Sequence, residues 1–175
     1  MAAFAMAFLG ACTGHYTGDR NAEAHAVQPP AAMAPLQPSA FSPYDSLRHA
    51  YSARDAEMAA DSYALDARVV YEGDPAGPAE FSGRDAIQSS FAEFFAGLDP
   101  ADALDLNFRV TGRRVLGDRI EEKGVYRLRA GRSVTSFGRF ETARDRASGL
   151  FLSDVSRPGT RADFEEAAGP VMLDA

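Results

Sequence analysis

The sequence predicts an α+β domain in which N-terminal helices pack on a curved, mainly antiparallel sheet. Two patterns of apolar residues support this prediction. Up to Leu98 apolar residues recur at helical spacing, and from Leu104 onward apolar and polar residues alternate. Helices that precede a run of strands joined by short turns are typical of a segregated α+β arrangement, in which the helices cover one face of the sheet.

Two short helices are expected at the start of the domain. Leu47, Ala50 and Tyr51 share one helical face, and after an interruption a second helical pattern continues to Tyr63. A short strand over residues 67–72 and a loop rich in glycine and proline follow.

The third helix has the strongest helical signal. Ser82 and Asp85 have the spacing of a capping box, so we expect the helix to begin between them. Asp99-Pro100 lies just after its end, as is common for proline. Large apolar residues of this kind are mostly buried, so we assign the stripe to the core; it comprises Ile87, Phe91, Phe94, Phe95 and Leu98.

A meander of four strands is expected after the helices. Gly117-Asp118 is a signal for a hairpin turn, and glycine marks the two later turns as well. The alternating segments between these turns cover residues 104–111, 120–128, 134–143 and 150–156. The globular domain is therefore predicted over residues 43–157, with a C-terminal tail over 158–175 that is either loose or forms a short helix around residues 162–168.

The N-terminal residues are expected to lie outside the fold. Residues 1–11 are almost wholly apolar but shorter than the roughly 20 residues that span a bilayer, as in the hydrophobic part of a secretory signal. Leu9-Gly10-Ala11-Cys12 resembles a bacterial lipobox, in which the cysteine is acylated. Residues 1–12 are therefore predicted to be a signal segment, and the proline-rich residues 13–42 a linker.

These features predict a bacterial protein in the cell envelope, anchored to a membrane through lipid at Cys12. The alternative is a cytoplasmic protein with a wrongly assigned start, because no lysine or arginine precedes the apolar run. The net charge of −7 argues against nucleic acid as a partner, since binding to phosphates requires a basic surface. With one cysteine, no internal disulfide or cysteine-based zinc site can form, and we expect neither a metal nor a cofactor.

Four short motifs stand out within residues 43–157: Tyr63-Ala64-x-Asp66-Ala67, Gly83-Arg84-Asp85-Ala86-Ile87, Gly138-Arg139-Phe140 and Ser153-Asp154-Val155-Ser156. With these motifs the segment resembles the NTF2-like superfamily, in particular its SnoaL-like or ketosteroid-isomerase-like branch. The resemblance implies a conical pocket between helices and sheet, and a homodimer formed through the sheet. The residues that we expect to line the cone are Tyr51, Glu72, Phe91, Phe108, Tyr126 and Phe140.

Two known activities of the superfamily do not fit this sequence. In a ketosteroid-isomerase-like site, the aspartate base would fall on Tyr71 and the tyrosine of the first helix on Leu47. A scytalone-dehydratase-like site uses two interior histidines, whereas His49 is the only histidine after the linker.

Three other polar residues are candidates for catalysis. Glu122 shares strand parity with Ile120 and Tyr126, so it would face an apolar cone in which its pKa would be raised. A bulge near Gly124 would instead turn Glu122 outward. Asp154 shares parity with Leu150 and Leu152 and would face Glu122 or Arg139, where a structural salt bridge is favoured over a catalytic role. Tyr71 lies at a strand end near the mouth of the cone.

The function predicted from these residues is binding of a small apolar or amphipathic molecule in the cone. An enzyme that performs acid/base chemistry, such as isomerisation, cyclisation or dehydration, is the first alternative. A module that serves only for dimerisation or interaction is the second. An acid and a base together in the cone would favour the enzyme, and a filled cone would favour the interaction module.

Overall fold

The computed structural model of the chain describes residues 42–73, 77–167 and 172–173. All elements below belong to a compact unit over Ser39–Ala175. The predicted signal segment and all of the linker except Ser42 lie outside the described residues. In the described part of the chain, no helix is long and apolar enough to cross a membrane.

The two N-terminal helices are α1 (Pro43–Ala53) and α2 (Ala56–Ala60). Pro43 stands in the first turn of α1, where the missing N–H costs no hydrogen bond. Asp55 caps α2 by accepting a hydrogen bond from the backbone N–H of Met58 at 2.9 Å. Between the helices, Arg54 donates hydrogen bonds to the backbone carbonyls of Asp99 (2.5 Å) and Asp102 (2.6 Å), which ties the end of α1 to the loop after the third helix.

The third helix is α3 (Arg84–Ala96), and its start differs from the prediction. The capping box expected from Ser82 and Asp85 is wrong, because the N-cap residue is Gly83 and no side chain caps the helix. Gly83 has a φ of 85°, a backbone conformation that glycine adopts more readily than other residues. The apolar stripe of α3 faces the core as predicted, with Ile87, Phe91 and Phe95 buried.

The strands form one seven-stranded sheet in the order β2-β1-β6-β5-β4-β3-β7. Four long antiparallel strands make up the predicted meander: β3 (Leu104–Leu116), β4 (Arg119–Ala130), β5 (Ser133–Asp145) and β6 (Phe151–Pro158). β1 (Tyr63–Tyr71) pairs in parallel with β6 and antiparallel with β2 (Ala79–Ser82). β2 and the two-residue β7 (Met172–Leu173), which pairs in parallel with β3, were not expected from the sequence.

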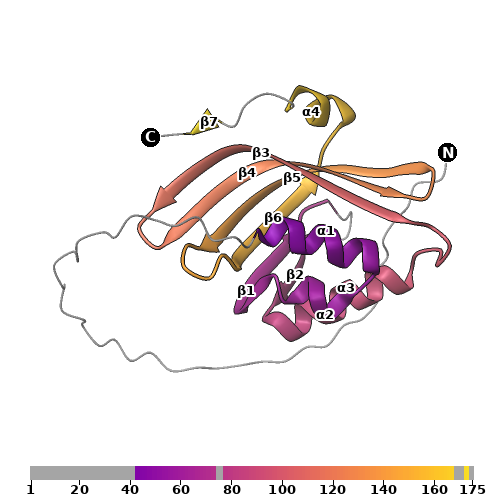
Figure 1. Cartoon of the computed structure of the whole chain (residues 1–175), viewed down its shortest axis with the longest axis horizontal. Helices are drawn as coiled ribbons and strands as arrows, with labels where there is room; N and C mark the ends of the chain where they lie inside the picture. The colour runs from indigo at the N-terminus through magenta and orange to yellow at the C-terminus, as the bar shows by residue number, and fades with distance from the viewer. Residues whose placement is uncertain (1–41, 74–76, 168–171, 174–175) are drawn as a thin grey trace. The chain divides into compact units, whose positions relative to one another are not determined.

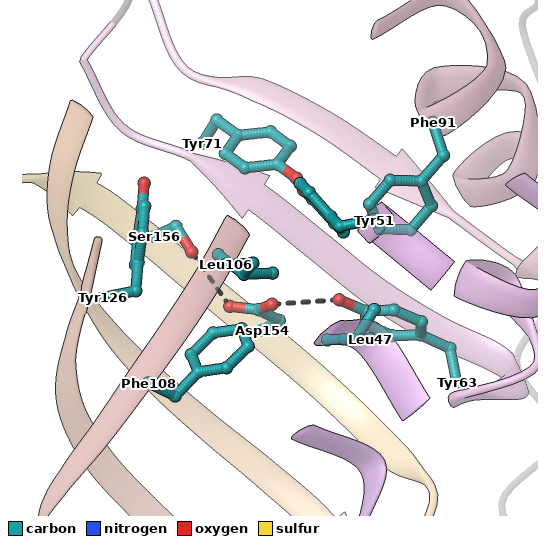
Figure 2. A pocket seen from close by; sticks show the side chains of 10 residues that line it. All are labelled: Leu47, Tyr51, Tyr63, Tyr71, Phe91, Leu106, Phe108, Tyr126, Asp154 and Ser156. Carbon is teal, nitrogen blue, oxygen red and sulfur yellow. Dashed lines mark hydrogen bonds between the residues drawn. The ribbon is translucent and has the colours of Figure 1, made fainter. Parts of the chain in front are cut away.

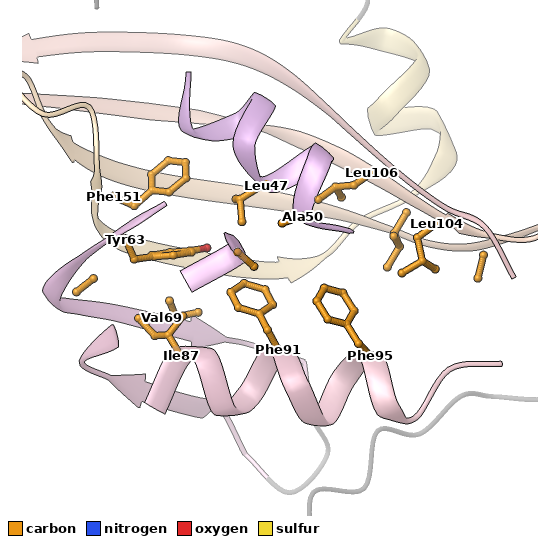
Figure 3. Close-up of a cluster of buried hydrophobic side chains, with 14 residues drawn as sticks. Leu47, Ala50, Tyr63, Val69, Ile87, Phe91, Phe95, Leu104, Leu106 and Phe151 are labelled. Carbon is orange, nitrogen blue, oxygen red and sulfur yellow. The ribbon is translucent and has the colours of Figure 1, made fainter. Parts of the chain in front are cut away.

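The curved sheet separates two helical layers. Helices α1, α2 and α3 cover one face, and the short α4 (Arg161–Glu166) lies on the other (Figure 1). The core fills the space between the three N-terminal helices and the sheet, where Phe91 and Phe95 of α3 lie opposite Leu47 and Ala50 of α1 (Figure 3). The sheet face that these helices cover is called the inner face below.

Two glycines allow large rings to lie across the inner face. A Cβ added to Gly138 would approach Cζ of Tyr126 to 2.2 Å, and one added to Gly124 would approach Cζ of Phe140 to 2.6 Å. Neither distance is sterically possible, so each glycine provides the space that the ring on a neighbouring strand occupies. The alternation along β4 keeps Glu122, Gly124 and Tyr126 on this face without a bulge at Gly124; the register shift lies across from it, between Val110 and Gly112 of β3.

A register shift in the last strand changes which residues face inward. The pairing of β5 with β6 skips Leu152, since Ala143 lies opposite Ser153 and Arg144 opposite Phe151. Phe151 is therefore completely buried in the core, whereas Leu152 is half-buried. The predicted parity of Asp154 with Leu150 and Leu152 is wrong for this reason.

Helix α4 packs on the outer face of the sheet through Phe164, which is 4% exposed. The guanidinium of Arg109 lies 3.9 Å from the centre of the Phe164 ring and that of Arg127 lies 5.3 Å from it, so two cations flank the ring. Asp163 accepts a hydrogen bond from Arg139 at 2.7 Å and forms a capping box with Thr160. Of the two alternatives predicted for residues 158–175, the short helix is the one present, and it packs on the sheet.

Candidate functional site

A cavity of about 40 Å³ opens between α1, α3 and the inner face of the sheet (Figure 2). Six of its ten lining residues carry an aromatic ring, and Asp154 is the one charged group among them. The lining residues are Leu47, Tyr51, Tyr63, Tyr71, Phe91, Leu106, Phe108, Tyr126, Asp154 and Ser156. The conical pocket implied by the resemblance therefore exists, but it is small and aromatic.

Asp154 occupies the polar centre of this cavity. Its Oδ2 accepts a hydrogen bond from the hydroxyl of Tyr63 at 3.1 Å, and its Oδ1 accepts one from the hydroxyl of Ser156 at 3.1 Å. Burial raises the pKa of Asp154 to about 6, although both hydrogen bonds favour the charged form. Asp154 as a whole residue is half-buried, and it is one of the residues that line the cavity. Each carboxylate oxygen keeps acceptor capacity for a further donor.

Four tyrosines contribute hydroxyl groups to the same site. Burial, with a further contribution from the Asp154 carboxylate, raises the pKa of Tyr126 to about 12 and raises the pKa values of Tyr51, Tyr63 and Tyr71 well above 10. All four hydroxyls therefore remain protonated at ordinary pH and can donate hydrogen bonds. Tyr71 is 37% exposed, the most of the four.

Glu122 lies in a different environment from the apolar one that was predicted. Its side chain is completely buried, and Nε of Arg113 donates to Oε1 at 2.6 Å while Nε of Arg144 donates to Oε2 at 3.0 Å. The hydroxyl of Tyr44 donates to Oε2 at 3.0 Å and also contacts Thr142 at 2.8 Å. Glu122 does not line the cavity, and its surroundings are those of a buried ion-pair cluster.

Asp154 has no arginine or other basic side chain as an ion-pair partner in the described part of the chain. It forms an ion pair with neither Glu122's arginines nor Arg139, which instead binds Asp163 on the outer face. The salt bridge considered for Asp154 is therefore wrong. No arginine, lysine or histidine lines the cavity among the described residues.

The remaining predicted residues divide between the cavity and its surroundings. Tyr71, together with Tyr51, Phe91, Phe108 and Tyr126, lines the cavity. Two assignments to the lining are wrong. Glu72 is exposed and lies 3.6 Å from Arg157, beyond the end of β1. Phe140 is buried behind the lining, where its ring packs against Tyr44 and Phe108.

Four lining residues were not predicted: Leu47, Tyr63, Leu106 and Ser156. Leu106 carried only the signal of a core residue, whereas Leu47 stands where the tyrosine of a ketosteroid-isomerase-like site would fall. Tyr63 was interpreted as a helix end, whereas it is the first residue of β1. Ser156 could have been found, because it stands two residues after Asp154 on the same strand and so shares its face.

A second hollow lies on the surface between α1 and β3, with a volume of about 390 Å³. It is lined by polar residues of α1, including His49, and by Asp105. Arg48 and Asp45 in its wall already pair with each other at 3.0 Å, with both side chains largely exposed. The charged groups of this hollow are exposed to solvent and do not converge on an apolar pocket. The interior cavity is therefore the stronger candidate for a binding site.

Comparison with known proteins identifies the fold. No family model and no curated protein matches the sequence. A putative calcium/calmodulin-dependent protein kinase type II association domain from Thiobacillus denitrificans superposes with a TM-score of 0.56 at 15% identity, covering 73% of this chain and 100% of its own. An NTF-2 like protein of unknown function from Shewanella oneidensis superposes with a TM-score of 0.53 at 14% identity, covering 66% of this chain and 93% of its own.

A Catenulispora acidiphila protein solved in complex with S-DNPA has a TM-score of 0.54 at 18% identity, covering 66% of this chain and 87% of its own. The described domain therefore has the NTF2-like α+β fold that the four sequence motifs predicted. At these identities the likeness extends to the fold alone, and the chemistry has to be argued from the residues of the cavity.

Proposed function

We propose that this NTF2-like domain binds a small molecule in its cone and that Asp154 holds the polar end of that molecule. The observation that carries the proposal is a carboxylate, without a basic side chain beside it among the described residues, that lines an aromatic cavity. Pockets of this kind, apolar with few polar groups that converge on one point, are the usual form of small-molecule sites.

The volume of the cavity limits the ligand. A water molecule needs roughly 10–15 Å³ on this measure, so about 40 Å³ holds about three water molecules. The buried part of the ligand consequently has only a few non-hydrogen atoms, either a whole small molecule or the head group of a longer one. The cavity is too small for a drug-sized ligand, because such ligands occupy pockets of roughly 300–1,000 Å³.

The test compares molecules that co-purify with the full chain and with two Leu→Phe variants. Leu106→Phe adds a ring at the cavity wall, and Leu116→Phe makes the same change on the exposed end of β3, where Leu116 is 43% exposed. Mass spectrometry should find a small molecule enriched with wild type and Leu116→Phe but depleted with Leu106→Phe. Equal recovery from all three proteins would contradict binding in the cone.

Acid/base catalysis is the second candidate, favoured by the pKa of about 6 at Asp154 and by tyrosine hydroxyls nearby. A carboxylate with such a pKa can accept a proton near neutral pH, and the hydroxyls can stabilise an oxyanion that forms as a result. If so, the protein should accelerate exchange of the α-protons of small ketones in D₂O, with a rate that rises through pH 6. Asp154→Asn should abolish this acceleration, and an unchanged rate in that variant would exclude Asp154 as the base.

We further propose export and lipid anchoring through Cys12, on the strength of Leu9-Gly10-Ala11-Cys12. Acylation of the cysteine together with an N-acyl chain would supply the two signals that stable anchoring needs. In a bacterial host, wild type should take up labelled palmitate and sediment with membranes. Cys12→Ala should do neither, and labelling of that variant at the wild-type level would rule out Cys12 as the anchor.

We also propose that the domain forms a homodimer through the outer face of the sheet. Helix α4 occupies the part of that face over Arg109 and Arg127, so the partner has to use the part around Glu141 and Arg157. These exposed side chains pair with each other within one chain at 2.9 Å, and charged contacts that they make with a second copy would weaken with salt. Sedimentation equilibrium should show a dimer that dissociates more readily at high salt. A monomer at every protein concentration would refute the proposed homodimer.

A further inference from the structure

We infer that the cone selects a cationic ligand, namely a small protonated or quaternary amine whose positive charge pairs with Asp154. The inference rests on the proposed function, because it names the chemical class of the molecule that the cone binds. It follows from the charge, the rings and the size of the cavity.

The first argument is the missing counterion of Asp154. Among the described residues, no basic side chain lies beside the carboxylate, and its hydrogen-bond partners are the hydroxyls of Tyr63 and Ser156. A buried charge without an opposite charge is costly, and a ligand that supplies the opposite charge recovers this cost on binding. A neutral ligand would leave the cost of the unpaired charge uncompensated.

The other buried carboxylate of the inner face shows that the fold can supply counterions. Glu122 has two arginines within 3.0 Å, from β3 and β5. Asp154 lies on β6, which β5 separates from the strand of Glu122, and among the described residues no basic side chain lines the cavity beside it. The two carboxylates therefore differ in whether an arginine already neutralises them. The charge of Glu122 is neutralised within the protein, whereas the charge of Asp154 can pair with a ligand.

The second argument is the aromatic lining. Tyr51, Tyr71, Phe108 and Tyr126 come from four different elements and surround the cavity that Asp154 faces (Figure 2). The face of an aromatic ring attracts a cation within about 6 Å of its centre, and cages of such rings recognise substituted ammonium groups. The cavity is small enough that an ammonium group beside Asp154 would lie close to several rings at once.

The test measures the binding of matched cations and neutral molecules to the full chain by calorimetry and NMR. The pairs are methylammonium with methanol, ethylammonium with ethanol, and tetramethylammonium with tert-butanol, which have equal numbers of non-hydrogen atoms. At pH 7.5 the best-fitting cation should bind about tenfold or more tightly than its neutral match, as an ion pair in a low-dielectric site with cation–π contacts predicts.

The preference should depend on pH in a defined direction. Protonation of Asp154 as the pH falls from 7.5 to 5 should weaken cation binding about tenfold, since the carboxyl with a pKa of about 6 becomes mostly neutral. The other titratable groups that face Asp154 are Tyr51 and Tyr44 of α1, Tyr63 and Tyr71 of β1, and Tyr126 of β4, and all stay protonated throughout this range. Binding of the neutral molecules should not weaken.

Two variants and a control assign the effect to the site. Asp154→Asn should abolish the preference for the cation while it retains binding of the neutral match. Asp105→Asn removes the same charge from an exposed side chain on β3 and should leave the preference intact. Tyr71→Leu, at a partly exposed position that tolerates change, should reduce cation affinity about 2- to 30-fold, the range expected for one cation–π contact, even if Asp154→Asn does not fold.

The outcomes separate this inference from the proposed function. A preference for cations that requires Asp154 supports the inference. Equal binding of cation and neutral match, or a preference that survives in Asp154→Asn, overturns it but leaves small-molecule binding intact. If none of the six molecules binds, the inference is overturned, and the comparison of Leu106→Phe with Leu116→Phe decides separately whether the cone binds anything.

Discussion

Replacing Asp154 with asparagine should change how the stability of the protein depends on pH. Burial raises the pKa of Asp154 from 3.8 to about 6 in the folded state. The folded protein therefore holds a proton on this group over a range of pH in which the unfolded chain has lost it. Asparagine has a similar shape and does not titrate, so the comparison isolates this one proton.

The magnitude follows from the difference between the two pKa values. They differ by about 2, and each pKa unit corresponds to about 1.4 kcal/mol, so the pH-dependent part of the stability is about 3 kcal/mol. Between pH 4 and 6 the folded state binds more protons than the unfolded state, and stability consequently falls as pH rises. This contribution is fully present below pH 3.8, is lost as pH rises towards 6, and levels off above that value.

The assay is a series of urea unfolding curves for both proteins from pH 3.5 to 7.5. Asp154→Asn should gain about 3 kcal/mol relative to wild type between the two ends of the series, with equal urea dependence of the unfolding free energy at each pH. Asp145→Asn is the control with the opposite sign. Hydrogen bonds from Ser148 lower the pKa of Asp145, so its stabilising contribution is present at neutral pH and is lost as pH falls.

Parallel curves for wild type and Asp154→Asn would refute the reasoning. They would mean that water reaches the carboxylate in the folded state as freely as in the unfolded chain. The proposal that Asp154 acts as an acid or base near neutral pH would then be refuted.

Three further predictions concern the surroundings of the site. Glu122→Gln should destabilise the protein by up to about 3 kcal/mol in urea unfolding, because it leaves Arg113 and Arg144 without their buried partner; unchanged stability would show that solvent screens the cluster. Gly138→Ala should cost about 1–3 kcal/mol and displace the ring of Tyr126, seen as altered NMR shifts in the cavity, whereas Gly97→Ala, with no close contact, should do neither. Phe164→Ala should abolish the protection of α4 against hydrogen exchange but not that of β4 and β5; retained protection would mean that Arg139 and Asp163 suffice to hold the helix.

The parts of the fold that could be predicted depend on local pattern. The stripe on α3 and the alternation along β3, β4 and β5 are properties of neighbouring residues, so periodicity identified them. The edge strand β2 is four residues long with a weak alternation, and its pairing with β1 depends on residues about twelve positions away. The pairing of β2 with β1 therefore could not be predicted from the pattern of neighbouring residues.

The site was less predictable because it depends on register and on distant partners. Parity correctly put Glu122 on the inner face, but no local pattern shows that Arg113 and Arg144 converge on it from the two neighbouring strands. For Asp154 the inward direction was inferred from Leu152, which the register shift in β6 removes from the inner face. A single skipped residue reverses every assignment before it on a strand, and this cannot be read from the order of residues.

The way in which α1 is held has a consequence for the thermodynamics of binding. Near the start of the helix, the hydroxyl of Tyr44 donates a hydrogen bond to Glu122 of the sheet. Just beyond the end of the helix, Arg54 donates hydrogen bonds to two backbone carbonyls. Leu47 and Tyr51, which form its side of the cavity, lie between these two fixed points. A wall that is already immobile loses little conformational entropy when a ligand arrives. Affinity should therefore rise with each ligand atom that fits and fall abruptly with the first that does not.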